Sequence, residues 1–367
     1  MHTTASLHVD AGRAFGTPER RVLHLLRGLM ERGHRALLCA PRRAPLFERA
    51  AQAGLPCEPL TLRSGLDFPS AVRLARLVGN DAYDLVHAHD AQSHSIARAA
   101  QGITPEPALC HNLFVTHHEV SEERGPAGHM RYANNGVHHI AASRQVRDAL
   151  VKRGVEAARI AIIPNAVDLE TLRASSHDPW GLRERGVRVI GTVGELTRDK
   201  NPALLLQAFA TLRKQMPQTH LLVVGSGPLR KSLRRRAAEL GVEDAVTFAE
   251  GADEPAAAYA ALDVFVQASD VDGPCTGMLD AMGAGKPVVT TAAAGVLNLA
   301  RHGTSALVVP PRDADALAQA MALVLQQPDL ATRLVDGARL VAEEHSVDSM
   351  IDATLAAYSR LATAETQ

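Results

Sequence analysis

Aromatic residues, cysteine and net charge are all scarce in this chain of 367 residues. Only 3% of the residues are aromatic, four are cysteine, and the net charge at pH 7 is -1. The balanced charge argues against a dedicated nucleic-acid-binding protein, because such proteins usually carry a basic excess. The cysteines show no Cys-x-x-Cys spacing, which disfavours a paired-cysteine redox or metal site.

Long apolar runs are also missing. No run approaches the roughly 18 to 20 apolar residues that span a bilayer, and the first segment lacks the apolar core of a signal peptide. We therefore expect a cytoplasmic protein. Residues 1–175 carry 21 basic and 17 acidic residues (+4), which leaves 18 and 23 (-5) for the remainder. This mildly basic half is compatible with peripheral contact with the inner face of an anionic membrane.

Short apolar runs alternate with helical patterns along the chain, which predicts α/β domains with mainly parallel sheets. At about 150 residues per domain, the length predicts two domains. The stretch 168–186 lacks a clear period, so we place the interdomain connection there. The predicted strands are 7–9, 35–40, 84–88, 113–116, 137–142 and 160–163, followed by 188–193, 220–224, 245–248, 264–267, 287–291 and 306–309.

Two glycine-containing loops follow predicted strands, where open α/β sheets bind ligands. The first holds Gly12 and Gly16 and precedes a predicted helix at 20–32. The second is Gly225-Ser-Gly-Pro228. In the first loop, glycines at the start of a helix bring backbone N–H groups close to an anion, and a simple tight connection is the alternative. The second loop is followed by a basic helix that could contact nucleic acid or lipid, and a solvated outer face is the favoured interpretation, because no aromatic residue is interleaved. Neither loop matches the dinucleotide or Walker fingerprints.

Histidine is concentrated in the first half, where 13 of the 17 lie in residues 1–175. No ligand spacing such as H-E-x-x-H occurs, so we expect no metal site. His118 stands out because it lies directly beyond the predicted strand 113–116, at the ligand edge of the sheet. A purely structural histidine is the alternative for this position.

The segment after the predicted strand 188–193 carries Arg198 and Lys200, and Asn201 and Pro202 then open a helix. An N-cap, a proline at the first helical position and adjacent cations together favour a phosphate site. An ordinary solvated loop is the alternative.

The segment after the predicted strand 264–267 combines three features of a nucleotide site. Thr276 is expected to cap the following helix, and Asp280 can accept two hydrogen bonds from a ribose diol. Free N–H groups around Thr276 and Gly277 can hold a phosphate oxygen.

Together these motifs resemble the retaining glycosyltransferases of family 4, whose signature reads E-G-F-P-x-x-x-L-E-A-M-A-x-G-x-P-V-V. Asp272 and Asp280 keep the separation of seven residues between its two acidic positions, and residues 279–289 follow the pattern closely. The likeness covers nearly the whole chain. Further matching segments are 28–34, 84–89, 116–118, 142–143, 164–168 and 224–228.

The resemblance implies the GT-B fold, with two doubly wound Rossmann-like domains facing each other across a cleft. Residues 1–172 would form the acceptor-side domain and residues 173–345 the nucleotide-sugar donor domain. Residues 346–367 would form a helix that returns to the first domain. The resemblance implies no cofactor beyond the donor itself, a UDP-sugar in the first instance, with GDP- and ADP-sugars as alternatives.

The resemblance also assigns roles to single residues. Asp280 would hold the ribose, Lys200 would neutralise the leaving diphosphate, and Asp272 would contact the donor sugar. His118 would line the sugar pocket near the reacting carbon. The expected catalytic residues are His118, Lys200 and Asp272, and the expected donor-binding residues are Gly12, Gly16, Arg198, Lys200, Gly225, Thr276, Gly277 and Asp280.

The sequence departs from the family pattern in three ways. Both signature carboxylates are Asp, and Ala268 replaces the usual proline before Ser269. Glu195 stands where the family has arginine in G-R-L-x-x-x-K, which changes the local charge by two units. Arg198 is a candidate to compensate for this change.

The resemblance therefore predicts a retaining transferase acting on a cell-surface glycan or lipid-linked acceptor, such as lipopolysaccharide core or capsule. No protein nucleophile or general base is expected, because the donor diphosphate can take the acceptor proton. Two alternatives stay open: a nucleotide-sugar epimerase or hydrolase of the same fold, and a non-catalytic nucleotide-sugar-binding scaffold. We expect no nucleic-acid partner.

Overall fold

The computed structural model describes residues 3–64, 67–81, 83–110, 112–120, 136–250, 255–270, 275–297 and 299–363. The chain forms two compact units. Unit 1 comprises residues 1–166 and 347–367, and unit 2 comprises residues 167–346. The divisions follow Ala166 and Ser346, compared with the expected boundaries after residues 172 and 345. Within the described ranges, no helix has both the length and the apolar character needed to cross a membrane.

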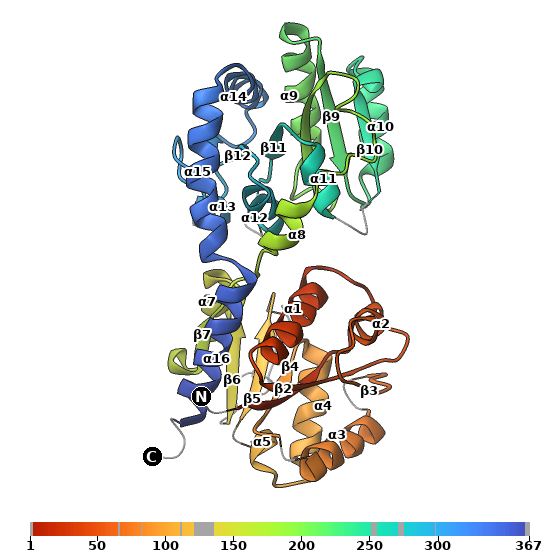
Figure 1. Ribbon diagram of the computed structural model, residues 1–367, viewed down its shortest axis with the longest axis vertical. Helices are drawn as coiled ribbons and strands as arrows, with labels where there is room; N and C mark the ends of the chain where they lie inside the picture. The colour runs from red at the N-terminus through yellow and green to blue at the C-terminus, as the bar shows by residue number, and fades with distance from the viewer. Residues whose placement is uncertain are drawn as a thin grey trace. The chain divides into compact units, whose positions relative to one another are not determined.

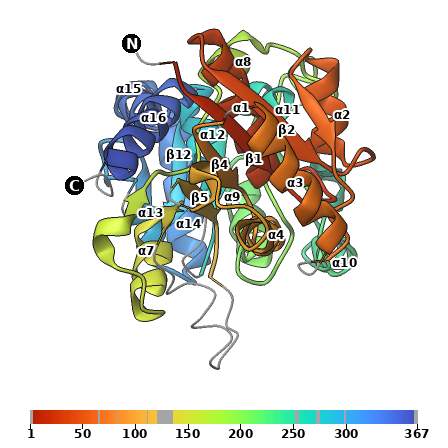
Figure 2. The ribbon, with the colours of Figure 1, turned by 90° about the horizontal axis from the view of Figure 1, so that it is seen from below.

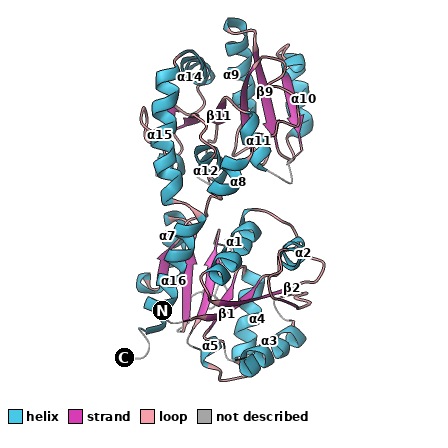
Figure 3. Ribbon diagram, in the orientation of Figure 1, coloured by secondary structure: helices cyan, strands magenta, loops and turns pink. Residues whose placement is uncertain are grey.

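Unit 1 is built on a parallel sheet of seven strands in the order β3-β2-β1-β4-β5-β6-β7. Figure 3 shows its strands in magenta between helices in cyan. The order reverses between β1 and β4, which creates a switch point where ligands bind in open α/β sheets. The strands are β1 (Ala5–Val9), β2 (Arg35–Ala40), β3 (Cys57–Pro59), β4 (Leu85–Ala88), β5 (Leu113–His117), β6 (Val137–Ala141) and β7 (Ile160–Ile162).

Helices cover both faces of this sheet, as its buried strands require. One face packs against α1, α2 and α16, and the other against α3, α4 and α5. Figure 2 shows α3 and α4 together beside the sheet. The helices are α1 (Thr17–Glu31), α2 (Pro45–Gln52), α3 (Phe68–Asp81), α4 (Ala91–Gln101), α5 (Pro107–Cys110), α7 (Arg144–Lys152), η1 (Ala157–Arg159) and α16 (Val347–Thr363).

The carboxyl-terminal helix α16 packs directly against α1, so the end of the chain belongs to unit 1. The contact is close at Gly28, where an added Cβ would lie 2.0 Å from Cδ1 of Ile351. Arg32 also donates a hydrogen bond of 2.7 Å to Asp348 at the rim of this contact. The helical pattern predicted near the end of the chain is therefore confirmed.

Unit 2 is built on a parallel sheet of six strands in the order β10-β9-β8-β11-β12-β13 (Figure 1). Helices α9, α10 and α14 cover one face, and α8, α11 and α12 the other. The strands are β8 (Arg188–Val193), β9 (Thr219–Val224), β10 (Val246–Ala249), β11 (Val264–Gln267), β12 (Val288–Thr291) and β13 (Leu307–Val309). The helices are α8 (Leu169–Ala174), α9 (Pro202–Gln215), α10 (Arg230–Glu239), η2 (Glu243–Ala245), α11 (Pro255–Ala261), α12 (Thr276–Gly283), α13 (Ala294–Leu297), α14 (Ala314–Gln326) and α15 (Pro328–Glu344).

The predicted fold class is confirmed, since every predicted run forms a strand and both sheets are parallel. Two local expectations differ from the structure. Strand β3 was not predicted, because it has only three half-buried residues and includes Pro59. The stretch 168–186 belongs to unit 2 instead of connecting the units, and its first part forms α8. Burial of Leu172 and Leu182 anchors this stretch to the unit 2 core.

Candidate active site

The carboxyl edge of the unit 2 sheet brings together the loops that follow β8, β9 and β11. Strand β8 lies at the switch point, between β9 on one side and β11 on the other. Gly194 donates from its N–H to the carbonyl of Val224 at 3.0 Å, and Leu196 donates to the carbonyl of Ser226 at 2.9 Å. The loop containing Lys200 and the Gly225–Pro228 loop are therefore joined through their backbones.

Two glycines allow backbone segments to approach closely at this edge. Gly225 has φ of +149°, and a Cβ there would lie 1.9 Å from the carbonyl oxygen of Gly194. A Cβ on Gly277 would lie 2.6 Å from the carbonyl oxygen of Val193, so the first turn of α12 lies against the end of β8. The capping role expected for Thr276 is wrong, because Cys275 occupies the cap position and makes no side-chain cap bond. Thr276 is the first residue of the helix.

We expect Gly225→Ala to lower the free energy of unfolding of unit 2 by about 2–4 kcal/mol, because the new methyl group would overlap a backbone oxygen. Gly241→Ala is the matched control, since Gly241 also has positive φ (+65°) but has no atoms within 4 Å of the added Cβ. That control should cost only about 1 kcal/mol. Urea unfolding followed by fluorescence of Trp180, the single tryptophan, reports on unit 2. Equal losses in the two variants would contradict the close contact.

Lys200 sits in a loop whose end is fixed by the expected N-cap. Asn201 has φ of +42°, accepts a hydrogen bond from the N–H of Leu204, and precedes Pro202 at the start of α9. Its side-chain amide also donates to Asp270 at 3.0 Å. Because Asp270 follows β11, this bond ties the loop after β8 to the loop after β11. Lys200 itself is half-buried.

The remaining expected residues of this edge differ in exposure. Asp280 is half-buried on α12, and its carboxylate lies 3.5 Å from the hydroxyl of Tyr259. Glu195 and Arg198 are both exposed. Asp272 lies outside the described residues. The loops and helix at the unit 2 edge therefore carry a cation, a carboxylate and closely approaching backbone segments. A cation and backbone N–H groups can bind a diphosphate, and a carboxylate can bind the hydroxyls of a ribose.

The loop after β1 in unit 1 donates its backbone N–H groups to carboxylates from the loop itself, from α1 and from the loop that follows β4. The N–H of Ala11 donates to Asp90 at 2.7 Å, that of Gly12 to Asp10 at 2.9 Å, and that of Gly16 to Glu19 at 2.8 Å. These are the groups that the glycine pattern suggests for an anion. In this structure they are already occupied, and three carboxylates surround them.

Burial and, to a lesser extent, the negative charges of Asp90 and Glu19 raise the pKa of Asp10 to about 7. The hydrogen bond from Gly12 acts in the opposite direction. Sequence reasoning missed Asp10 and Asp90 as a pair. Their positions directly beyond two neighbouring strands were a usable signal, because carboxyl ends of adjacent parallel strands meet at one edge.

His118 follows β5 at the same edge of the unit 1 sheet and is partly exposed. Burial lowers its pKa to about 4, and the positive charge of Arg21 contributes to the shift. Arg21 is buried on α1 and donates to the carbonyls of Ile163 and Pro164 at 3.0 and 2.5 Å. The imidazole of His118 is therefore neutral near pH 7 and can offer a lone pair or an N–H to a sugar hydroxyl.

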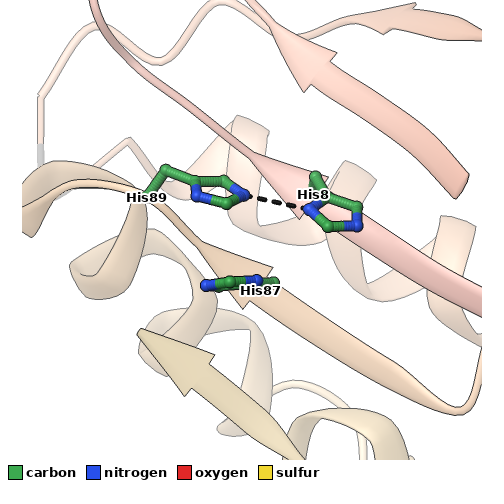
Figure 4. Close-up of side chains that lie close together, drawn as sticks. All are labelled: His8, His87 and His89. Carbon is green, nitrogen blue, oxygen red and sulfur yellow. Dashed lines mark hydrogen bonds between the residues drawn. The ribbon is translucent and has the colours of Figure 1, made fainter. Parts of the chain in front are cut away.

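A buried histidine stack lies beneath this edge (Figure 4). His8 and His89 are joined by a hydrogen bond of 3.0 Å, and the ring of His87 lies 4.1 Å from that of His89. One nitrogen from each ring lies within 4.8 Å of the others, so the distances alone suggest a metal triad. Both nitrogens of His87, however, bind other groups: the hydroxyls of Tyr358 and Thr116, at 2.6 and 2.7 Å. The rings of His8 and His89 are stacked, and the ring of His87 is tilted against both.

A second histidine pair, His117 and His139, is buried with a nitrogen–nitrogen distance of 2.9 Å. The alternation of side chains between the two faces of a sheet explains why the histidines form two separate groups. His87 and His117 come from the adjacent strands β4 and β5, whose side chains alternate between the two faces of the sheet. A sequence count of histidines cannot separate these sets, because their partners are far apart in the chain.

Comparison with known proteins shows two family models that together span most of the chain. The model of glycosyltransferase family 4 matches residues 18–171. The model of glycosyl transferases group 1 matches residues 178–341. The two matched segments correspond closely to the first part of unit 1 and to unit 2.

Characterised relatives are similar over different shares of their length. A D-inositol 3-phosphate glycosyltransferase of Corynebacterium urealyticum is 30% identical over 309 residues, covering 77% of this chain and 72% of that protein. A GDP-mannose-dependent alpha-(1-6)-phosphatidylinositol monomannoside mannosyltransferase of Mycolicibacterium smegmatis is 33% identical over 190 residues. That match covers 49% of this chain and 48%, about half, of the relative.

Solved structures share the fold across nearly the whole chain. HepE of Anabaena, in complex with UDP, has a TM-score of 0.81 at 20% identity, covering 97% of this chain and 100% of that one. A lipopolysaccharide outer core galactosyltransferase in its apo form has a TM-score of 0.71 at 16% identity, covering 97% and 99%. These likenesses confirm the two Rossmann-like domains of the GT-B fold. Together with the family models and the Corynebacterium relative, they show that the chain belongs to glycosyltransferase family 4.

Proposed function

We propose that this protein is a retaining glycosyltransferase that moves a sugar from a nucleotide-diphosphate sugar to a cell-surface glycan or lipid-linked acceptor. The observation that carries the proposal is the carboxyl edge of the unit 2 sheet, in a chain of this family. There the Gly225 loop, Lys200, Asp280 and the start of α12 provide contacts for a phosphate and a ribose. The lipopolysaccharide and phosphatidylinositol substrates in the names of similar proteins support the acceptor class.

A UDP-sugar is the proposed donor, and a GDP-sugar is the alternative. The complex of HepE with UDP supports the first, and the GDP-mannose-dependent relative supports the second. Asp280 would accept hydrogen bonds from the ribose hydroxyls, while N–H groups at Thr276 and Gly277 would hold a phosphate oxygen. Lys200 would neutralise charge on the departing diphosphate.

In the proposed reaction, the acceptor oxygen attacks the anomeric carbon as the bond to the diphosphate oxygen breaks. The acceptor proton passes to that diphosphate, so no protein base is needed. The attack takes place on the face from which the diphosphate leaves, which retains the anomeric configuration. His118, neutral near pH 7, would bind a hydroxyl of the donor sugar close to the reacting carbon.

We expect Lys200→Ala to weaken binding of the nucleotide diphosphate by about 10- to 100-fold, because a charge-assisted contact contributes roughly 1.5–3 kcal/mol. Calorimetry and thermal shift with UDP, GDP, ADP, CMP and their sugar conjugates would measure this. Lys214→Ala is the matched control, since this exposed lysine lies at the opposite end of α9. Glu195→Gln should strengthen binding, because it removes a negative charge from the loop of Lys200.

Binding of one nucleotide that is lost in Lys200→Ala and kept in Lys214→Ala would support the donor site. Binding that is equal in both variants would contradict it. Absence of binding by every nucleotide, with recovery in Glu195→Gln, would favour the non-catalytic scaffold. Release of free sugar without transfer would favour a hydrolase, and the anomeric configuration of a transferred product, read by NMR, tests retention.

A further inference from the structure

The nitrogens of the histidine stack belong to two separate hydrogen-bond chains. One chain joins Tyr358, His87 and Thr116. The other begins at Nε2 of His89, passes through Nδ1 and then Nε2 of His8, and reaches the hydroxyl of Ser6 at 2.9 Å. Of the six ring nitrogens in the described stack, only Nδ1 of His89 is buried without a hydrogen-bond partner.

The second chain fixes the protonation pattern of His89. The hydroxyl of Ser6 donates its one proton to the carbonyl of Arg35 at 3.2 Å, so it accepts from Nε2–H of His8. Nδ1 of His8 then carries a lone pair and accepts from Nε2–H of His89. A neutral imidazole has only one N–H, and therefore Nδ1 of His89 carries a lone pair. Burial holds His89 neutral by lowering its pKa far below the ordinary value.

His89 lies at the ligand edge of unit 1. It directly follows β4, and its N–H donates to the carbonyl of Val9 at 2.9 Å, so it stands beside the end of β1. This is the switch point between β1 and β4, where open α/β sheets bind ligands. A buried acceptor without a donor costs about 1–3 kcal/mol, which a ligand can recover by supplying an O–H or N–H group.

The lone pair on Nδ1 restricts the chemistry of that ligand. The carboxylates of Asp10 and Asp90 lie in the adjoining loops, and the positive charge of Arg21 acts on His89. A bare Nδ1 cannot donate a hydrogen bond to a phosphate or carboxylate. A neutral hydroxyl group fits this position, because it can donate to Nδ1 of His89.

We propose that Nδ1 of His89 is a hydrogen-bond acceptor for a hydroxyl group of a sugar or related polyol substrate, held in place by His8 and Ser6. The proposal rests on the proposed function and adds a substrate-binding residue to unit 1. The hydroxyl belongs either to the donor sugar or to the acceptor. Because Nδ1 is buried in this structure, binding requires a neighbouring segment to move.

Long-range proton–nitrogen NMR of protein labelled with ¹⁵N-histidine tests the proposal directly, because it distinguishes a protonated ring nitrogen from a bare one. We expect His8 and His89 both to be protonated at Nε2. Addition of UDP-glucose or GDP-mannose, but not UDP or GDP, should shift the Nδ1 signal of His89 if the donor supplies the hydroxyl. A shift that needs glucose, mannose or myo-inositol in the presence of the nucleotide assigns it to the acceptor.

Two substitutions at His89 distinguish the sugar contact of Nδ1 from the structural contact of Nε2 with His8. The amide of asparagine reaches the position of Nδ1, and that of glutamine reaches the position of Nε2. His89→Gln should therefore keep the contact with His8 and weaken binding of the responding sugar by about tenfold. His89→Asn should keep most of the affinity. His139→Gln, which alters the other buried histidine pair, is the control and should leave sugar binding unchanged.

Several results would overturn the proposal. One is an Nδ1 signal that does not respond to any of these sugars while calorimetry shows that a nucleotide sugar binds. Equal affinity in His89→Gln and the parent, or a stoichiometric transition metal in the purified protein, would do the same. If no nucleotide or sugar binds at all, the proposed function fails together with this one, whereas nucleotide binding without an effect at His89 refutes only this inference.

Discussion

At pH 5.5, unit 1 is expected to unfold while unit 2 remains folded. Unit 1 buries histidines that are neutral in the folded state, because burial lowers the pKa of each below its ordinary value of 6.5. The pKa falls to about 3 for His8 and His117 and to about 4 for His118. It falls well below the ordinary value for His87, His89 and His139.

The sign follows from proton uptake. The unfolded chain binds protons at these six positions below about pH 6.5 and the folded chain does not, so stability falls as the pH falls. At pH 5.5, one unit below the ordinary histidine pKa, each position costs on the order of 1 kcal/mol, so the six together cost several kcal/mol. The raised pKa of Asp10 has the opposite effect, because the folded state takes up this proton more readily than the unfolded chain. It therefore adds about 2 kcal/mol of stability as the pH falls from 7 to 5.5. The net loss is comparable with the whole stability of a typical domain.

Two probes separate the units in an acid titration. Far-UV circular dichroism reports on both, whereas fluorescence of Trp180 reports on unit 2 alone. Among the described residues of unit 2, only His220 is a histidine with a lowered pKa. We expect part of the helical signal to disappear near pH 5.5 without a change at Trp180. Coincident loss of both signals, or no loss down to pH 4, would contradict the expectation.

Asp280→Ala is expected to weaken binding of the nucleotide by about 100-fold or more. The proposed ribose contact consists of two hydrogen bonds to a carboxylate, and each such bond contributes roughly 1.5–3 kcal/mol. The side chain is half-buried on α12, where its charge is only partly screened by water. Isothermal titration with the nucleotide that the parent binds best measures the change directly.

The conservative variant provides the control for this prediction. Asp280→Glu restores the carboxylate with the residue that the family usually carries, so its affinity should stay within about tenfold of the parent. Urea unfolding followed at Trp180 checks that unit 2 keeps its stability in both variants. Unchanged affinity in Asp280→Ala would contradict the assignment of Asp280 to the ribose and leave Lys200 as the proposed nucleotide contact.

Sequence patterns predicted the elements of the fold because each has a local cause. Apolar runs mark the buried strands, and Asn201 followed by Pro202 marks the start of α9 as observed. Short or weakly buried elements were missed, as β3 shows. The cap of α12 was also misjudged, because Cys275 holds that position without a side-chain bond and leaves Thr276 inside the helix.

The site in unit 1 was less predictable because its interactions join distant parts of the chain. Gly12 and Gly16 suggested an anion cradle, and only the fold brings Asp90 to the N–H of Ala11. The histidine stack has the same origin, since His8 and His89 are 81 positions apart. Composition revealed many histidines, but their neutral state depends on burial that no local pattern encodes.

Helix α16 also sets the order in which the protein can be completed during synthesis. Unit 1 needs Tyr358 to bind His87 and Ile351 to pack on α1, yet 180 residues of unit 2 (167 to 346) are made in between. At roughly 5–20 residues per second, the ribosome leaves unit 1 unfinished for on the order of 10–40 s. During that interval the face of α1 that receives α16 is uncovered and open to chaperones. Unit 2 has no such delay, because its whole sequence is continuous.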